Sequence, residues 1–128
     1  MWVLNSGCGE IITVNLASGK EKIVSLPGYT RGLALMGQYA FVGLSKIRET
    51  ATFGNLPLCD RRNDLKCGIC VVNLNTRQMI SCLEFSEGVD EIFDIQIGQF
   101  SSAMICDPYA VTDSNDHIWS LPASSRRI

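Results

Sequence analysis

Charged side chains that could hold a ligand stand at residues 31–49 and at residue 91. The guanidinium of an arginine presents five N–H donors in one plane, so it can hold two oxygens of a carboxylate or phosphate at once. A lysine adds a compact cation, and a glutamate can accept hydrogen bonds or act as a base. The sequence predicts a ligand-binding set made of Arg31, Lys46, Arg48, Glu49 and Glu91.

The sequence supplies no recognisable catalytic machinery. Asp90, Glu91 and Asp94 could form a carboxylate pair, but no nucleophile or further base accompanies them in the sequence. The only histidine is His117, and the sequence contains neither a glycine-rich phosphate-binding motif nor a nucleophile elbow. No catalytic residue is therefore assigned.

The six cysteines, at positions 8, 59, 67, 70, 82 and 106, are interpreted as buried thiols. Cys70, Cys82 and Cys106 lie in apolar runs, where a free cysteine behaves as a small hydrophobe. A Cys59–Cys67 disulfide is the alternative. Cys67 and Cys70 are spaced like a pair of zinc ligands, but residues three apart on a strand point to opposite faces. No metal and no cofactor is predicted.

Length and composition indicate one domain, or part of one. The chain has 128 residues, 46% of them hydrophobic, and a formal net charge of −2. That balance gives no reason to expect nucleic acid or an anionic membrane as a partner. No apolar run approaches the roughly 18 residues of a membrane-spanning helix. The sequence therefore predicts a cytoplasmic protein.

An internal repeat is the main clue to the fold. Residues 10–19 align without a gap with residues 68–77, 58 positions further on. Each copy is a short β-branched strand, then a polar turn, then another short strand, and each copy has a further strand before it. Asn15 and Asn73 precede the turns and are predicted to anchor them. No apolar period of 3.6 residues persists, so the sequence predicts an all-β antiparallel meander.

A meander that repeats every four strands is typical of a β-propeller blade, as in WD40-like proteins. The predicted complete blade spans about residues 30–85, with strands at 32–35, 39–44, 68–74 and 79–85. A blade without its inner strand precedes it at about 2–26, and the next blade begins at about 91–106 with strands at 92–97 and 103–106. This partial propeller of 1–106 is followed by a divergent tail at 107–128. A β-sandwich is the alternative fold.

The connecting segments divide into two groups at opposite ends of the meander. Segments 5–9, 27–31, 45–66 and 86–91 share one end, and they carry the unusual polar residues. Aligning the blade junctions places Glu91 at the position of Arg31 on the neighbouring inner strand, so the pair is either a ligand-binding rim or an ion pair between blades. Segment 45–66 has five basic and three acidic side chains, a net charge of +2, and the rest of the chain carries −4.

Three further stretches, residues 26–34 (LPGYTRGLA), 39–49 (YAFVGLSKIRE) and 53–58 (FGNLPL), carry a family resemblance. They resemble a bacterial family of uncharacterised, propeller-like proteins that occur alone or fused to tetratricopeptide repeats. The resemblance covers about residues 2–98 and implies a truncated C-terminal part of a longer protein. Arg77 departs from the family, which has a glycine in that turn, and so does the tail after Phe100. The resemblance implies no particular activity.

Three functions are therefore compatible with the sequence. The first is a binding module whose loop face takes a protein partner or a polar or anionic small molecule. The second is an enzyme domain in which Arg31 and Lys46 hold an anionic substrate and Glu49 or Glu91 is the base. The third is an inactive fragment. Open sheet edges also predict self-association, because unpaired strand edges pair with other chains.

Overall fold

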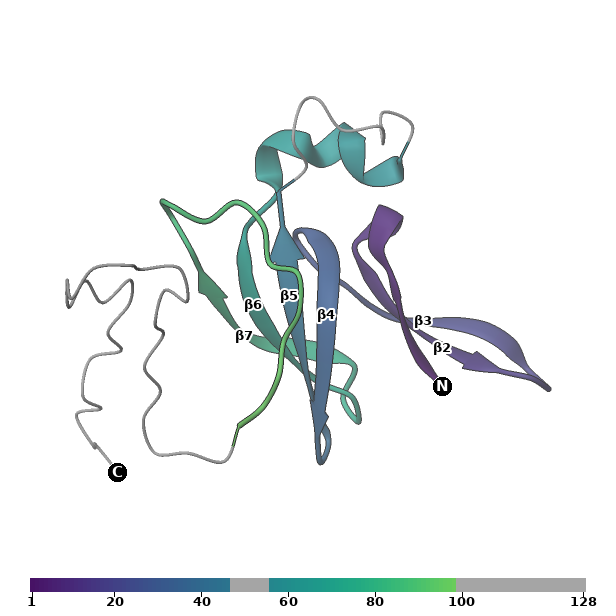
Figure 1. Ribbon diagram of the computed structural model, residues 1–128. Helices are drawn as coiled ribbons and strands as arrows, with labels where there is room; N and C mark the ends of the chain where they lie inside the picture. The colour runs from purple at the N-terminus through teal and green to yellow at the C-terminus, as the bar shows by residue number, and fades with distance from the viewer. Residues whose placement is uncertain (47–55, 99–128) are drawn as a thin grey trace. The chain divides into compact units, whose positions relative to one another are not determined.

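The computed structural model describes residues 1–46 and 56–98. Residues 1–97 form one compact unit. This unit contains two antiparallel sheets, the first of three strands and the second of four, and in both sheets the strand order follows the chain (Figure 1). The all-β antiparallel meander predicted from the repeat is confirmed.

The first sheet comprises β1 (Trp2–Asn5), β2 (Glu10–Asn15) and β3 (Gly19–Ser25). A short 3-10 helix, η1 (Ser6–Cys8), joins β1 to β2. It ends at Gly9, whose φ of 67° lies in the left-handed region that glycine adopts without steric cost.

The second sheet comprises β4 (Tyr29–Met36), β5 (Tyr39–Ser45), β6 (Gly68–Asn73) and β7 (Gln78–Glu84). These are the four strands of the predicted complete blade, and β4 begins three residues earlier than expected. The 3-10 segment η2 (Pro57–Asp64) lies in the long connection between β5 and β6.

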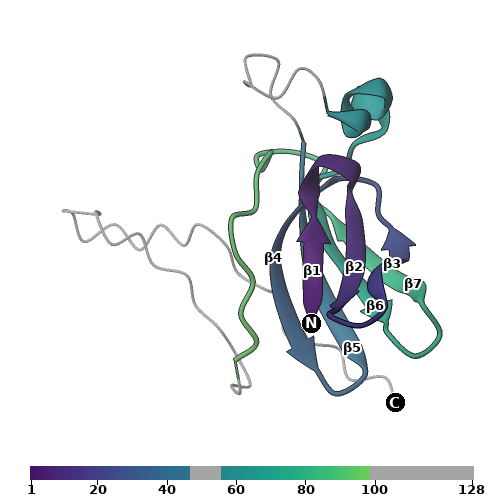
Figure 2. The ribbon, with the colours of Figure 1, turned by 90° about the vertical axis from the view of Figure 1, so that its right-hand side faces the viewer.

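The strand predicted at 92–97 does not form. Residues 89–98 are not paired in a sheet, although a Cβ at Gly32 or Gly43 would touch Asp94 or Ile92. The segment therefore packs on β4 and β5, and in Figures 1 and 2 it passes β4 on the side away from the first sheet. Alternation in the sequence predicts an extended chain, but a strand also needs a neighbouring edge to pair with. The strand at 103–106 lies outside the described residues, and the boundary at residue 106 stays a prediction.

The core lies between the two sheets. Ile11, Ile23 and Leu26 come from the first sheet and the residue after it. They pack against five buried side chains of the second sheet, namely Ala40, Val42, Leu44, Cys70 and Val72. Burying a side chain of this size contributes roughly 1.5–3 kcal/mol, so this contact is what makes two small sheets one folding unit.

The repeat in the sequence is a repeat in the structure. Asn15 Oδ1 accepts a 2.9 Å hydrogen bond from the Ala17 amide, and Asn73 Oδ1 accepts one of 3.0 Å from the Asn75 amide. Both asparagines therefore anchor their turns, as predicted. The backbones also match, because Leu26 N donates to Gly9 O (2.7 Å) just as Phe85 N donates to Cys67 O (2.9 Å).

The prediction of free thiols is wrong for two of the six cysteines. Cys70 on β6 and Cys82 on β7 lie directly opposite each other, with Cα atoms 4.0 Å apart, and form a disulfide. The Cys59–Cys67 alternative is also wrong, because Cys67 is a buried thiol. The sequence shows two apolar cysteines but not the register that pairs them. Disulfides persist in oxidising compartments and are rare in the cytosol, where thiols are kept reduced. The Cys70–Cys82 disulfide therefore does not favour the predicted cytoplasmic location.

Candidate functional site

The connecting segments predicted to share one end do meet there, as far as they are described. Lys66 N donates a 2.8 Å hydrogen bond to Pro27 O, and Lys46 N donates one of 2.9 Å to Asp90 O. Ser6 Oγ donates to Thr30 O at 2.7 Å. We call this end of the two sheets, formed by residues 5–9, 27–31, 45–46, 56–66 and 86–91, the loop end.

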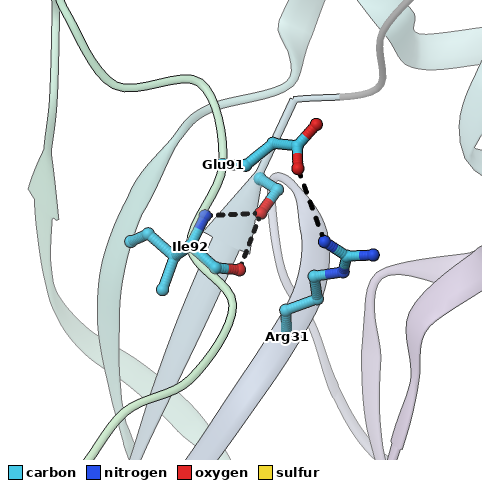
Figure 3. A network of polar contacts seen from close by, with 4 residues as sticks. Arg31, Glu91 and Ile92 are labelled. Carbon is cyan, nitrogen blue, oxygen red and sulfur yellow. Dashed lines mark hydrogen bonds and ion pairs between the residues drawn. The ribbon is translucent and has the colours of Figure 1, made fainter.

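An ion pair between Arg31 and Glu91 lies at the loop end (Figure 3). Arg31 Nη1 is 3.5 Å from Glu91 Oε2, and the two side chains are 34% and 20% exposed. Arg31 belongs to β4, whereas Glu91 belongs to the segment that follows β7. The alignment of blade junctions therefore correctly places the two residues side by side.

Two aromatic rings accompany the Arg31 guanidinium. Its Cζ lies 5.6 Å from the centre of the Tyr29 ring and 4.9 Å from that of Phe93. A cation over an aromatic ring gains roughly 0.5–1 kcal/mol at an exposed site, so the rings help to fix the guanidinium. Phe93 is 72% exposed, and a large apolar ring left so open can contact a bound molecule.

Ser45 fastens the segment that carries Glu91. Its buried Oγ accepts a 2.9 Å hydrogen bond from Ile92 N and donates one of 3.1 Å to Ile92 O (Figure 3). Gly43 makes this close approach feasible, because a Cβ there would overlap the Arg31 carbonyl and lie 2.7 Å from the Ile92 side chain. A hydroxyl at the end of β5 thus sets the distance between Glu91 and β4.

A second ion pair lies beside the first. Lys46 Nζ is 3.7 Å from Asp90 Oδ1, and the Asp90 side chain is 69% exposed. Such an exposed pair contributes little to stability. Lys46 thus keeps its cation at the surface of the loop end, within reach of a ligand that can replace Asp90.

Cys67 is a poor nucleophile in this setting. It is fully buried, and burial raises the pKa of its thiol above the ordinary 9.0. Lys46 acts to lower the pKa, whereas Asp90 and Glu91 raise it further. The reactive form of a cysteine is the thiolate, so Cys67 stays protonated and unreactive near neutral pH.

The described part of the 45–66 segment is held down by apolar side chains. Leu58 and Leu65 are buried, and a Cβ at Gly9 would lie 2.9 Å from the Leu58 side chain. Lys66 pairs with Glu84 of β7 at 2.7 Å. Of the predicted ligand-binding set, Arg48 and Glu49 lie outside the described residues, so the structure brings together Arg31, Glu91 and Lys46.

The described residues were also compared with what a metal site, a membrane-spanning helix or a second ligand pocket would need. Among residues 1–46 and 56–98, no three histidine, cysteine or acidic side chains gather where a metal could bind. In the same part of the chain, no helix has the length and apolar character to cross a membrane. A shallow hollow at the opposite end of the first sheet has no charged side chain in its lining, which is Met1, Thr13, Val14, Asn15 and Leu16.

Comparison with known proteins identifies a family whose function is unknown. A family model described as "Domain of unknown function (DUF4915)" matches residues 1–105. The chain belongs to the DUF4915 family. Searches of curated proteins and of solved structures each found no match. The DUF4915 match gives no evidence for a propeller or for fusion to tetratricopeptide repeats, both of which the resemblance implied.

Sequence reasoning missed three residues of this site. Tyr29 and Phe93 flank Arg31, and Ser45 holds the Ile92 backbone. Tyr29 could have been found, because residues two apart on a strand share a face. A serine that binds backbone atoms 47 residues away has no signal in the sequence.

Proposed function

We propose that this DUF4915 chain is part of a β-propeller whose loop end binds an anionic group on a protein or small-molecule partner. The propeller would supply a rigid scaffold, and binding residues commonly lie on loops that such a scaffold positions. The proposal has two parts, the stacking of the sheets as blades and the binding at the loop end.

The stacking is supported by equivalent residues that face the same way. Ile11 in β2 corresponds to Ile69 in β6, and Val14 corresponds to Val72. Ile11 faces the second sheet and Val72 faces the first, so both belong to the core between the sheets. Ile69 and Val14, their counterparts, lie on the two outer faces and are half-buried. This is the pattern of copies stacked in the same orientation, as propeller blades are.

The binding is supported above all by the setting of Arg31. The guanidinium lies near two rings and is paired through Nη1 with Glu91. A side chain already held in place loses less entropy when it binds a ligand. Its remaining donors suit a carboxylate or a phosphate, Lys46 supplies a nearby cation, and Phe93 an exposed apolar contact.

The enzyme alternative has less support. Cys67, whose pKa is influenced by Lys46, Asp90 and Glu91, is buried with a raised pKa. Glu91 is paired with Arg31 and would have to leave it in order to act as a base. No observation on the described residues favours catalysis over binding.

The binding can be tested by titrating the chain with an acidic peptide and, separately, with inorganic phosphate while amide NMR shifts are recorded. We expect saturable shifts at residues 29–31, 45–46 and 90–93, weakening with salt because Coulomb attraction is screened. Lys46→Glu and Phe93→Ala should abolish them, whereas Lys20→Glu, on the exposed β3 at the other end, should not. Peptide binding alone would point to a protein partner. No shifts with either probe would overturn the binding proposal.

A further inference from the structure

The two outer faces of the stacked sheets are apolar. By repeat position, the outer face of the first sheet corresponds to the core face of the second sheet, and the outer face of the second sheet corresponds to the core face of the first. On the first sheet, Val3 and Ile12 form a cross-strand pair that corresponds to Val42 and Cys70 of the second sheet. Val42, Cys70 and Val72 are completely buried by the first sheet. Val3, Ile12 and Val14 are only half-buried. We call the surface of Val3, Ile12, Val14 and Leu16 the outer face of the first sheet.

Leu16 is the clearest mark of an uncovered contact. Its exposure reaches 105%, which is unusual for a leucine and costs roughly 1.5–3 kcal/mol relative to burial. Its repeat counterpart, Leu74, packs against the core. A leucine at this repeat position is therefore packed in the second sheet, where the first sheet covers it. It is exposed in the first sheet, where no sheet among the described residues covers it.

The second sheet shows the complementary case. Leu4, Ile11 and Val24 lie in register on the core-facing side of the first sheet. Their counterparts by register are Gly43, Ile69 and Leu83. Leu83 is 58% exposed, and Phe41 and Ile69 are half-buried. We call the surface of Phe41, Ile69 and Leu83 the open face of the second sheet.

We propose that a second copy of this chain docks the outer face of its first sheet on the open face of the second sheet. The contact repeats, between chains, the packing of the two sheets within one chain. Such a contact is heterologous, so it builds a ring if the rotation closes and a filament if it does not. This inference rests on the stacking proposed above, and its test is separate from the titration that tests ligand binding at the loop end.

The segment after β7 fits the same arrangement. Glu91 corresponds to Arg31, so residues 91–96 correspond to residues 31–36 of β4, the strand that pairs with β5. In the next unit the counterpart of β5 is β1, whose outer edge is unpaired among the described residues. Residues 91–97 cannot reach β1 of their own chain, because the second sheet lies between them. They would lie beside β1 of the docked copy.

Complementary variants test the head-to-tail contact by sedimentation velocity. Leu16→Lys spoils the outer face and Leu83→Lys spoils the open face, both at exposed positions that leave folding intact. We expect the unmodified chain to associate with rising concentration, and each variant alone to associate about tenfold or more weakly. An equimolar mixture should form a discrete heterodimer, because it retains one intact pair of faces. Ile80→Lys, 54% exposed and at the β7 register shift, is the matched control.

Several outcomes of the sedimentation experiment would overturn the head-to-tail contact. A monomeric unmodified chain at the highest soluble concentration would overturn the proposal. So would a mixture that stays monomeric. Undiminished association of either variant alone would also overturn it, because that outcome indicates a symmetric contact between like faces. Retained peptide or phosphate binding in those cases would leave the loop-end function standing.

A crosslink tests the predicted register. Leu33 lies opposite Val42, so Phe93 of one copy should lie opposite Val3 of the next. Mixing Val3→Cys with Phe93→Cys under mild oxidation should give a covalent heterodimer, because paired positions meet disulfide geometry. Leu16→Cys mixed with Phe93→Cys should not. Equal crosslinking in both mixtures would overturn the register.

Discussion

Gly19 and Arg77 align when the two repeats are compared, and both have a positive φ, of 80° and 59°. The left-handed conformation costs a residue with a Cβ roughly 1–2 kcal/mol. The Arg77 side chain forms an ion pair with Glu21, which offsets part of this cost. A glycine would adopt this backbone conformation without steric cost, whereas the arginine adopts it at a cost and adds an ion pair between the two sheets.

Arg77→Gly should stabilise the protein slightly. Removing the strained conformation gains about 1 kcal/mol, whereas an exposed ion pair is worth about 0.2–1 kcal/mol. We expect a net rise of about 0.5 kcal/mol in the free energy of unfolding, measured by urea denaturation. Gly19→Ala is the reciprocal variant and should destabilise by about 1 kcal/mol, although nothing lies within 4 Å of its new Cβ. Equal stability of Gly19→Ala and the unmodified chain would contradict the strain argument.

Arg31→Ala and Glu91→Ala should be coupled in a double-mutant cycle. Arg31 Nη1 and Glu91 Oε2 are 3.5 Å apart and both side chains are mostly buried, so each single variant removes this ion pair. We expect a coupling free energy of about 0.5–1 kcal/mol in urea unfolding. The pair Lys22 and Glu10, with Lys22 61% exposed, should couple more weakly. Additive effects at residues 31 and 91 would mean that the pair does not tie the segments together.

The Cys67 thiol should make the protein less stable in alkali. Burial raises its folded-state pKa above 9.0, so the native protein holds this proton at pH values where the unfolded chain loses it. The contribution is complete below about pH 9 and declines as the pH rises toward the folded-state pKa. Cys67→Ala should therefore flatten the decline of unfolding free energy above pH 9. An unchanged slope would contradict it.

Neighbouring charges should shift that titration in opposite directions. Lys46→Gln removes a group that lowers the pKa of Cys67, and Asp90→Asn removes one that raises it. At pH 9, a thiol reagent should therefore modify Cys67 faster in Asp90→Asn than in Lys46→Gln. Mass mapping identifies the modified residue, and the order of the rates tests the sign.

Reducing the Cys70–Cys82 disulfide should destabilise the second sheet. The bond joins residues 12 apart in the sequence, and a loop of about that length corresponds to roughly 3 kcal/mol of lost unfolded-state entropy. We expect urea unfolding with a reductant to show a loss of about 2 kcal/mol or more. A Cys70→Ala, Cys82→Ala variant should be equally unstable with and without reductant.

Most of the strands and part of the candidate site could be predicted from the sequence. β5 and β6 were predicted almost to their ends, because β-branched alternation and turn residues mark them locally. The alignment of repeats also placed Glu91 beside Arg31. The Cys70–Cys82 bond and the contact between Ser45 and Ile92 were missed, because both depend on how segments pack after folding. The predicted 92–97 strand was wrong for the same reason, since local alternation does not show whether a neighbouring edge is available for pairing.

The connection between β5 and β6 has a consequence for the rate of folding. β5 ends at Ser45 and β6 begins at Gly68, whereas the other neighbouring strands are joined by two to four residues. Closing a longer loop costs more entropy before any contact repays it. The hairpins β4–β5 and β6–β7 should therefore form first, and the pairing of Val42 with Cys70 should limit the rate of assembly.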